Sequence, residues 1–493
     1  MSRRHSLEAS PPRRLFLKTT AAAVAGFSAR LSRSAPVQAQ SSQTVPPAAA
    51  TSPVPGGWGP FTPSNHAGQY FRIEYPASTT EGALQIAVAY TLWIPDKVPT
   101  LRALIVHQHG AGIPAAQAGA TSAYDLHWQA LAKKWNCALL GPSYHVLNDA
   151  IDLTPGGSEL WFDPRKGSDQ VFLKALQELG DKSGHPELAT VPWCLWGHSG
   201  GGIWSNVMSM LHPGRVLAVF LRSGTATMFR PRPEFHQPQV PAAVYQIPTM
   251  INFGMGEKGK RPWDGSLATF QEYRGQGAPI GFAPDPRTEH FCGDARYLAI
   301  PFFDACLAMR LAENGQPLRP VDMGQAWLAA PWSEVTAPLA KFRGDRKQAG
   351  WLPNEAVAQA WTEYVKTGTV SHSAAPPAPS NVRITARPDQ SYEIAWEAEA
   401  DFVVGLGGFV ILRDGHGIAR LPERPPDSVY GRPLFQGLSY HDTPFAPIPQ
   451  MVYRDTSAQR GAKHVYTVFA LSSAGVPSAA SSPAAAGYAG ASE

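Results

Sequence analysis

A five-residue segment, Gly197-His198-Ser199-Gly200-Gly201, constrains the fold of this chain more than any other feature. The run before it, Trp193–Trp196, is typical of a strand buried on both faces, and Ile203–Leu211 after it has helical spacing. A strand that passes directly into a helix needs a sharp turn, and flanking glycines allow both a strained backbone and a close approach of helix and strand. The segment therefore predicts a strand–turn–helix unit with Ser199 at the turn. A glycine-rich turn with an incidental serine is the simpler alternative.

Strand-like and helical patterns alternate around this unit. Strands are predicted at Gln69–Tyr75, Ala83–Trp93, Leu104–Val106, Ala138–Pro142, Val216–Leu221 and Thr249–Phe253, and helices at Leu126–Trp135, Ser168–Leu179, Leu298–Leu311 and Ala356–Val365. This alternation indicates an α/β fold, with a mostly parallel sheet covered by helices on both faces. Residues 312–370 are expected to pack against the same domain.

The texture of the chain changes after a Ser-, Ala- and Pro-rich linker at residues 371–379. Short alternating runs follow, separated by turn signals: Val382–Ile384, Tyr392–Trp396, Gly408–Gly415 and His464–Ala470. Such runs are typical of a small all-β sandwich. The stretch between Asp414 and Val465 is long for a loop of such a domain.

The first 39 residues carry the pattern of an export signal. Arg13–Lys18 (Arg-Arg-Leu-Phe-Leu-Lys) reads as a twin-arginine motif, and a mildly apolar stretch, Thr19–Ser28, follows it. Arg30 and Arg33 lie beyond that stretch, where positive charge disfavours the general secretory route, and Val37-Gln38-Ala39 fits a cleavage site. We therefore expect a periplasmic or secreted protein. A disordered basic N-terminus is the alternative.

These patterns divide the 493 residues, which are too many for one ordinary core, into five parts. They are a twin-arginine signal peptide (1–39), a flexible leader (40–56), an α/β domain (57–370), a linker (371–379) and a β-sandwich (380–493). Removal of the signal takes away seven of 42 basic and one of 38 acidic residues, so the net charge changes from +4 to −2. The basic balance is thus no indication of a nucleic-acid partner. Beyond the signal, no run approaches the length of a membrane span.

Neither a cofactor nor a metal is predicted. The four cysteines, Cys137, Cys194, Cys292 and Cys306, lack zinc-ligand spacing and contain no C-x-x-C pair. An exported protein could join them in one or two disulfides or keep them as buried thiols, and the sequence favours neither.

Between a buried strand and a helix, the Gly-His-Ser-Gly-Gly segment resembles the nucleophile turn of the α/β-hydrolase superfamily. The resemblance extends from about Tyr70 to Leu311. Within the superfamily, this region is similar to secreted esterases and polyester-depolymerase-like members. The resemblance implies the order nucleophile, acid, histidine. Glu257 follows Gly254 at the end of the strand Thr249–Phe253, where the acid is expected, and His290 precedes the last helix. A capping role for His290 and a surface-turn role for Glu257 are the alternatives.

The resemblance assigns roles to these residues. His290 would accept the proton of Ser199 as general base, and Glu257 would orient His290 and stabilise its cation. The rival acids Asp285, Glu289 and Asp294 all lie in the loop of the histidine itself.

The oxyanion hole needs two backbone donors. One is expected at Gly200, directly after the nucleophile, and the other at Ala111, in the turn His107-Gln108-His109-Gly110-Ala111-Gly112. His107 and His109 stand two residues apart on a strand and could be read as metal ligands. No third ligand has suitable spacing, so a packing or anchoring role is favoured.

Tyr144 and His145 follow the strand that is expected to end near Pro142, on the side of the sheet where substrates gather in α/β proteins. We predict that they line the substrate pocket together with Trp161. Plain loop packing is the alternative.

The resemblance implies an exported serine esterase without a cofactor, acting on small-molecule or polymer esters through an acyl-enzyme. A peptidase on the same scaffold and a non-catalytic binding protein of hydrolase shape are the alternatives. The C-terminal part resembles a fibronectin type III domain, with Trp396 at the early core-tryptophan position and Tyr466 at the late-strand tyrosine position. We expect it to act as a spacer or to dock the enzyme on a polymer or cell surface; covering an apolar face of the hydrolase is the alternative.

Overall fold

The computed structural model describes residues 61, 64–65, 68–112, 115, 118–145, 158–230, 237–313, 317–424, 429–432, 434–445, 447–448, 451–458 and 462–486. The predicted signal peptide (1–39) and leader (40–56) lie outside these residues and stay predictions.

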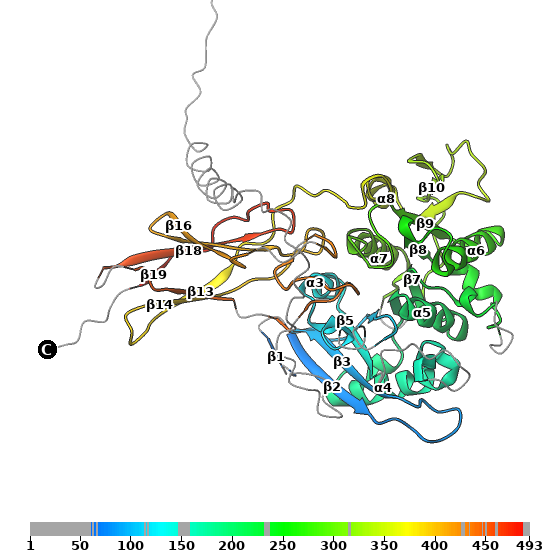
Figure 1. The fold of residues 1–493 in the computed structure, drawn as a ribbon, viewed down its shortest axis with the longest axis horizontal. Helices are drawn as coiled ribbons and strands as arrows, with labels where there is room; N and C mark the ends of the chain where they lie inside the picture. The colour runs from blue at the N-terminus through cyan, green and yellow to red at the C-terminus, as the bar shows by residue number, and fades with distance from the viewer. Residues whose placement is uncertain are drawn as a thin grey trace, which may run out of the picture.

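The largest sheet has the strand order β1-β2-β3-β5-β4-β6-β7-β8-β9 (Figure 1). Its strands are β1 (Ser64–Asn65), β2 (Gly68–Tyr75), β3 (Ala87–Pro95), β4 (Ala103–Gln108), β5 (Cys137–His145), β6 (Trp193–His198), β7 (Val216–Arg222), β8 (Thr249–Gly254) and β9 (Ile280–Asp285). Pairing is antiparallel from β1 through β3 to β5, and parallel from β5 across β4 to β9. Every residue of β4, β6 and β7 is buried, as the continuous apolar runs predict for strands covered on both faces.

Helices cover both faces of this sheet, which confirms the predicted α/β architecture. The helices are α3 (Leu126–Lys134), α4 (Ser168–Ser183), α5 (Gly200–Leu211), α6 (Arg261–Gly275), α7 (Arg296–Arg310) and α8 (Glu355–Thr367). Side chains of α4, α5 and α6 share one hydrophobic core, and those of α3, α7 and α8 share the core on the opposite face. The two cores explain why the chain alternates between strand and helix patterns.

Two elements of the α/β unit, β9 and α6, are not apparent from the sequence patterns. Strand β9 reads Ile-Gly-Phe-Ala-Pro-Asp, in which Gly281 and Pro284 dilute the apolar run. Helix α6 has a proline in its first turn, Gly265 inside it and a weak apolar stripe, so its helical period is hard to recognise. With β9 in place, β8 is the last strand but one, as the position of Glu257 requires.

Residues 317–370 pack against the same unit, as expected. They contain a three-stranded antiparallel sheet of β10 (Trp327–Ala329), β11 (Thr336–Pro338) and β12 (Gly350–Leu352), followed by α8. The indole of Trp361 donates a hydrogen bond of 2.8 Å to the carbonyl of Phe282 in β9.

The C-terminal part forms two antiparallel sheets that enclose one core, which confirms the predicted all-β sandwich. The sheets have the orders β13-β14-β17 and β16-β15-β18-β19. Their strands are β13 (Ser380–Ala386), β14 (Tyr392–Glu397), β15 (Gly408–Arg413), β16 (His416–Leu421), β17 (Val452–Asp455), β18 (His464–Leu471) and β19 (Ala484–Ala486). The core contains Trp396 from one sheet and Phe409 and Tyr466 from the other.

The described residues between β16 and β17, which lie within 422–451, contact both the sandwich and the α/β unit; we name them the β16–β17 segment. Phe435 and Met451 of this segment belong to the sandwich core. Gln436 accepts a hydrogen bond from the amide of Leu126 (3.0 Å) and donates one to the carbonyl of Tyr124 (2.8 Å). Leu126 itself belongs to the sandwich core, and α3 lies at the junction of the two parts in Figure 1. The long stretch seen in the sequence is therefore an interface.

In the part of the chain that the structure describes, helices fall short of the length and apolarity needed to cross a membrane.

Candidate active site

Ser199 occupies a strained turn between β6 and α5. Its backbone has φ 53° and ψ −117°, a conformation that residues with a side chain rarely adopt, and its amide donates a hydrogen bond of 2.7 Å to the carbonyl of Arg222. A Cβ atom at Gly197 would lie 2.1 Å from the carbonyl oxygen of Gly201, and one at Gly224 would lie 1.9 Å from that of Ser199. Close backbone approach thus requires both glycines, and the sequence pattern predicts this for Gly197.

His290 and Glu257 meet at one edge of this turn. The Nδ1 atom of His290 lies 2.5 Å from Oε1 of Glu257, while the other carboxylate oxygen accepts a hydrogen bond of 2.6 Å from the hydroxyl of Ser223. Burial alone would raise the pKa of Glu257, but the hydrogen bonds and charges of His290, Ser223 and Arg222 outweigh burial, and the pKa is lowered. Glu257 is therefore an anion that holds Nδ1–H of His290, which leaves Nε2 free to accept a proton.

The rival acids are bound elsewhere. Asp285 accepts hydrogen bonds from the hydroxyl of Tyr364 (2.8 Å) and the amide of Arg287 (2.9 Å). Glu289 is exposed and faces Lys260 at 3.6 Å.

The third rival, Asp294, accepts hydrogen bonds from the hydroxyl of Thr369 (2.5 Å) and the amide of Arg432 (2.6 Å). Of the acids considered from the sequence, only Glu257 contacts the imidazole of His290 within the described residues.

Ser199 and His290 line the same cavity, whose volume is about 90 Å³. The other lining residues are Ile203, Ser223, Gly224, Thr225, Met228, Arg261, Pro262 and Gly265. No hydrogen bond among the described residues joins the hydroxyl of Ser199 to the ring of His290. Such bonds often tighten only when substrate is bound.

The two predicted oxyanion donors lie together. A Cβ atom at Gly200 would lie 3.2 Å from the amide nitrogen of Ala111, so these backbones run side by side. Gly200 opens α5, where the first amides of a helix have no partner in the helix itself. Within the described residues neither amide donates a hydrogen bond, and both are available to an oxygen atom placed between them.

His107 and His109 act as anchors. The ring of His107 donates to Asp442 over 3.2 Å and stacks on Trp196 with ring centroids 4.2 Å apart. His109 accepts a hydrogen bond of 3.1 Å from the amide of Tyr144. Among the described residues, no group of three or more His, Cys, Asp or Glu side chains could hold a metal ion.

The structure does not bring the predicted pocket residues to the cavity. Tyr144 is fully buried, stacks on Trp161 with centroids 4.3 Å apart and shares a hydrogen bond of 3.1 Å with the hydroxyl of Tyr90. Trp161 is 1% exposed, and His145 ends β5. None of the three predicted residues lines the cavity beside Ser199, because the carboxyl end of β5 is covered by the segment that carries Trp161.

Two buried side chains missed by the sequence reasoning hold the backbone around His290. The guanidinium of Arg222 donates to the carbonyls of Glu289 (3.0 Å) and Phe291, and the Nε2 atom of His198 lies 2.7 Å from the carbonyl of His290. Three consecutive carbonyls are thus fixed from β6 and β7. A charged residue at the end of the apolar run Val216–Leu221 was the available signal for Arg222.

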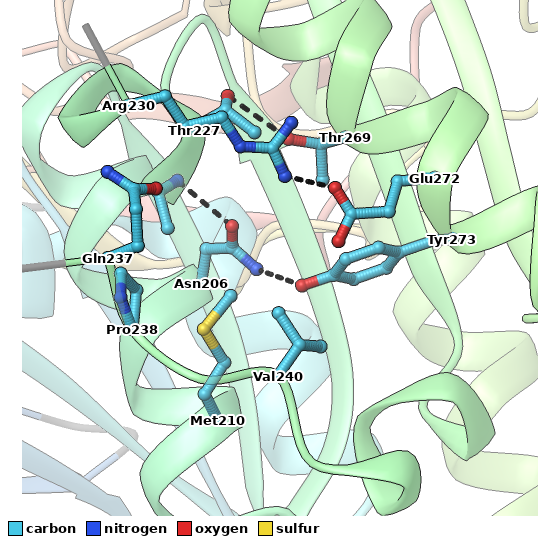
Figure 2. A pocket seen from close by; sticks show the side chains of 11 residues that line it. Asn206, Met210, Thr227, Arg230, Gln237, Pro238, Val240, Thr269, Glu272 and Tyr273 are labelled. Carbon is cyan, nitrogen blue, oxygen red and sulfur yellow. Dashed lines mark hydrogen bonds and ion pairs between the residues drawn. The ribbon is translucent and has the colours of Figure 1, made fainter.

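A second cavity of about 20 Å³ lies between α5 and α6 (Figure 2). Its polar groups are largely paired with one another. Asn206 donates a hydrogen bond of 3.1 Å to the hydroxyl of Tyr273, and Arg230 forms an ion pair with Glu272. Ser199 and His290 do not line it. A cavity of this size admits about one water molecule, so it is no substrate site.

The four cysteines, left open by the sequence, are all buried and free. Burial raises the pKa of Cys137 to about 12, with a smaller opposing effect of Arg102. Such a thiol is not a nucleophile at neutral pH.

The strand order, the turn after β6 and the acid after β8 define the α/β-hydrolase fold. No protein-family model and no curated protein sequence matches the chain. Among solved structures, it is similar to an S-formylglutathione hydrolase from Agrobacterium tumefaciens, with 16% identity over 50% of this chain and 95% of that chain and a TM-score of 0.33. A dienelactone hydrolase from Anabaena variabilis shares 18% identity over 46% and 89%, with a TM-score of 0.30. An Fn3-like protein from Clostridium thermocellum shares 20% identity over 23% and 92%, with a TM-score of 0.15.

Proposed function

We propose that this chain is an exported serine hydrolase that cleaves carboxylic esters with Ser199, His290 and Glu257. The observation that carries the proposal is the 2.5 Å contact of His290 with Glu257 beside the cavity that Ser199 also lines. A carboxylate that holds one ring nitrogen leaves the other as a base next to a hydroxyl, which is the requirement for nucleophilic catalysis by serine.

The proposed reaction has two halves. The oxygen of Ser199 attacks the ester carbonyl and its proton passes to Nε2 of His290, while the amides of Gly200 and Ala111 bind the oxyanion. The carbon–oxygen bond to the alcohol then breaks, and the alcohol leaves with the proton from His290. A water molecule repeats the sequence on the acyl-enzyme, releases the acid and restores Ser199.

Hydrolysis of short p-nitrophenyl esters tests the proposal. The Ser199→Ala substitution should lower kcat by about 10⁴-fold or more, and a fluorophosphonate probe should label the unsubstituted chain only. Undiminished turnover in this variant would remove Ser199 from the mechanism. Parallel assays with peptide substrates separate an esterase from a peptidase, and failure of both labelling and turnover would favour a binding protein.

Export through the twin-arginine route is a second part of the proposal, and it depends on the sequence around Arg13 and Arg14. In a host with that route, the chain should accumulate outside the cytoplasm, and the double substitution Arg13→Lys and Arg14→Lys should retain it inside. Equal export of both chains would contradict this assignment.

We further propose that the C-terminal sandwich is a fibronectin type III-like unit, because sheets of three and four strands surround Trp396 and Tyr466. Its contacts with the α/β unit favour a covering role. Docking to a polymer or cell surface is tested by co-sedimentation of the full chain with an insoluble polyester, using bovine albumin as the reference for non-specific binding.

A further inference from the structure

The β16–β17 segment reaches the backbone that carries His290. The Nδ1 atom of its His441 lies 2.9 Å from Nδ1 of His198, although the two residues are 243 positions apart. The opposite nitrogen of His198, Nε2, lies 2.7 Å from the carbonyl of His290. A continuous line of hydrogen bonds therefore runs from the C-terminal part of the chain to the histidine of the site.

The direction of these hydrogen bonds follows from chemistry. A carbonyl oxygen only accepts, so Nε2 of His198 must carry the proton. A neutral imidazole has one N–H group, which makes Nδ1 of His198 an acceptor and Nδ1 of His441 the donor. Burial, followed by the charges of His441 and His290, lowers the pKa of His198 well below its ordinary value, so the neutral form holds. Burial likewise lowers the pKa of His441, to about 3.

His441 thus stabilises the tautomer of His198 that the carbonyl of His290 requires. Without a donor at Nδ1, His198 could carry its proton on that atom, and the lone pair of Nε2 would then face the carbonyl oxygen of His290 at 2.7 Å. That contact would be repulsive, and the main chain of His290 would move. A shift of about 1 Å in a catalytic group can cost about 100-fold in rate.

The segment is itself held rigidly at this point. The neighbour of His441 on one side, Tyr440, accepts a hydrogen bond of 3.1 Å from the amide of Cys292, two residues after His290. The neighbour on the other side, Asp442, is fully buried and bonded to Arg296 of α7. The ring of His441 also lies next to the nucleophile: a Cβ atom at Gly110 would contact both Nδ1 of His441 (3.2 Å) and Cβ of Ser199 (3.3 Å).

We propose that His441 is a positioning residue of the active site, which helps to fix the main chain of His290 by stabilising the Nε2–H tautomer of His198. The C-terminal part of the chain would then complete the hydrolase. This inference rests on the proposed ester hydrolysis.

Two isomeric amide substitutions in the full chain test it. In His441→Asn the amide nitrogen takes the place of Nδ1, whereas in His441→Gln it takes the place of Nε2, so the two variants are polar and differ mainly in where the donor stands. We expect His441→Gln to lower kcat about 10- to 100-fold with KM nearly unchanged, and His441→Asn to restore most of the loss. Titration with a fluorophosphonate gives the concentration of folded, reactive molecules, so kcat is calculated per active site in each variant.

Equal kcat values for the two variants, high or low, would overturn the role of His441. We first measure the esterase activity of the unsubstituted chain and its loss in Ser199→Ala. A failure of the proposed function is therefore distinguished from a failure of the proposed role of His441. If neither amide variant folds, ¹⁵N chemical shifts of the histidine rings in the unsubstituted chain decide. His198 protonated on Nε2 at neutral pH supports the proposal, and protonation on Nδ1 overturns it.

Discussion

The guanidinium of Arg296 binds the carboxylate of Asp442 with an Nε–Oδ1 distance of 2.7 Å, and both side chains are fully buried. Arg296 begins α7 of the α/β unit, and Asp442 belongs to the β16–β17 segment. Asp125 contacts the same guanidinium at 2.7 Å. Burial alone would lower the pKa of Arg296, but the charges of Asp125 and Asp442 outweigh burial and raise it. The two parts of the chain therefore meet in a buried charged cluster.

Removal of one member of this cluster should destabilise the protein strongly. The substitution Asp442→Asn leaves the charge of Arg296 only partly compensated, and we expect a loss of about 3–5 kcal/mol in the free energy of unfolding, measured with urea. The exposed pair Lys133–Glu399 joins the same two parts of the chain. Glu399→Gln is the matched control and should cost about 1 kcal/mol or less. A similar loss of unfolding free energy in both variants would show that the buried cluster contributes no more to stability than the exposed pair.

A chain that ends at residue 379 should not fold. Such a chain lacks Asp442, one of the two carboxylate partners of Arg296, as well as the hydrogen bonds of Gln436 and the sandwich core that covers Leu126. We expect it to be insoluble and unreactive toward a fluorophosphonate, measured as soluble fraction and labelling against the full chain. A soluble, reactive fragment would show that the α/β unit is autonomous.

Ser223 should influence catalysis through Glu257. Its hydroxyl donates a hydrogen bond of 2.6 Å to the carboxylate, so it helps to hold Glu257 as an anion facing His290. Ser223→Ala should lower kcat about 10-fold, the cost of one hydrogen bond to a charged group. Ser209→Ala, which removes a buried hydroxyl bonded within α5, is the control and should leave kcat unchanged. Equal rates for all three chains would exclude this role.

Stability should fall in acid because several histidines are buried in the neutral form. Burial, followed by the charge of Arg296, lowers the pKa of His127 to about 3. In the unfolded chain a histidine titrates near about 6.5. Between these values the unfolded state binds the extra proton, so stability decreases as the pH falls below about 6.5.

The contribution of His127 can be separated from the rest. Its Nε2 atom donates a hydrogen bond of 3.0 Å to the carbonyl of Phe402. The side-chain amide of a glutamine can donate the same hydrogen bond. His127→Gln should reduce the slope of unfolding free energy against pH, between about pH 6 and 4, by about 1.4 kcal/mol per unit. Urea unfolding at several pH values measures the slope. Parallel curves for both chains would contradict a neutral buried His127.

Arg261 should favour esters that carry a negative charge. Its side chain is exposed and lines the cavity beside Ser199. Within the described residues Arg261 forms no ion pair. The described residues that line this cavity include no Asp or Glu. We expect Arg261→Gln to lower kcat/KM for a carboxylate-bearing ester about 3- to 5-fold relative to its neutral analogue, as for an exposed charge pair. Lys258→Gln, an exposed change outside the cavity, should leave the ratio unchanged. An unaltered ratio in Arg261→Gln would contradict the prediction.

The sequence by itself determined the strand–turn–helix unit around Ser199 and the alternating α/β pattern. These features are local, because an apolar period and flanking glycines report directly on the backbone of the segment that carries them. The order of Ser199, Glu257 and His290 was expected only from the resemblance to the α/β-hydrolase superfamily. Strand β9 and helix α6 could not be predicted, because Gly281, Pro284 and Gly265 interrupt their patterns.

Only the tertiary structure decided which distant side chains meet. Tyr144 and Trp161 follow the pattern of pocket residues, yet they stack on each other in the core, because the covering segment determines their exposure. His198 stands within the most informative motif of the chain, but its partner, His441, is 243 residues away in a long loop. No periodicity encodes such a pair. The pair forms because the β16–β17 segment, anchored by Asp442, packs against the large sheet. The sequence pattern of that sheet gives no sign that this segment contacts it.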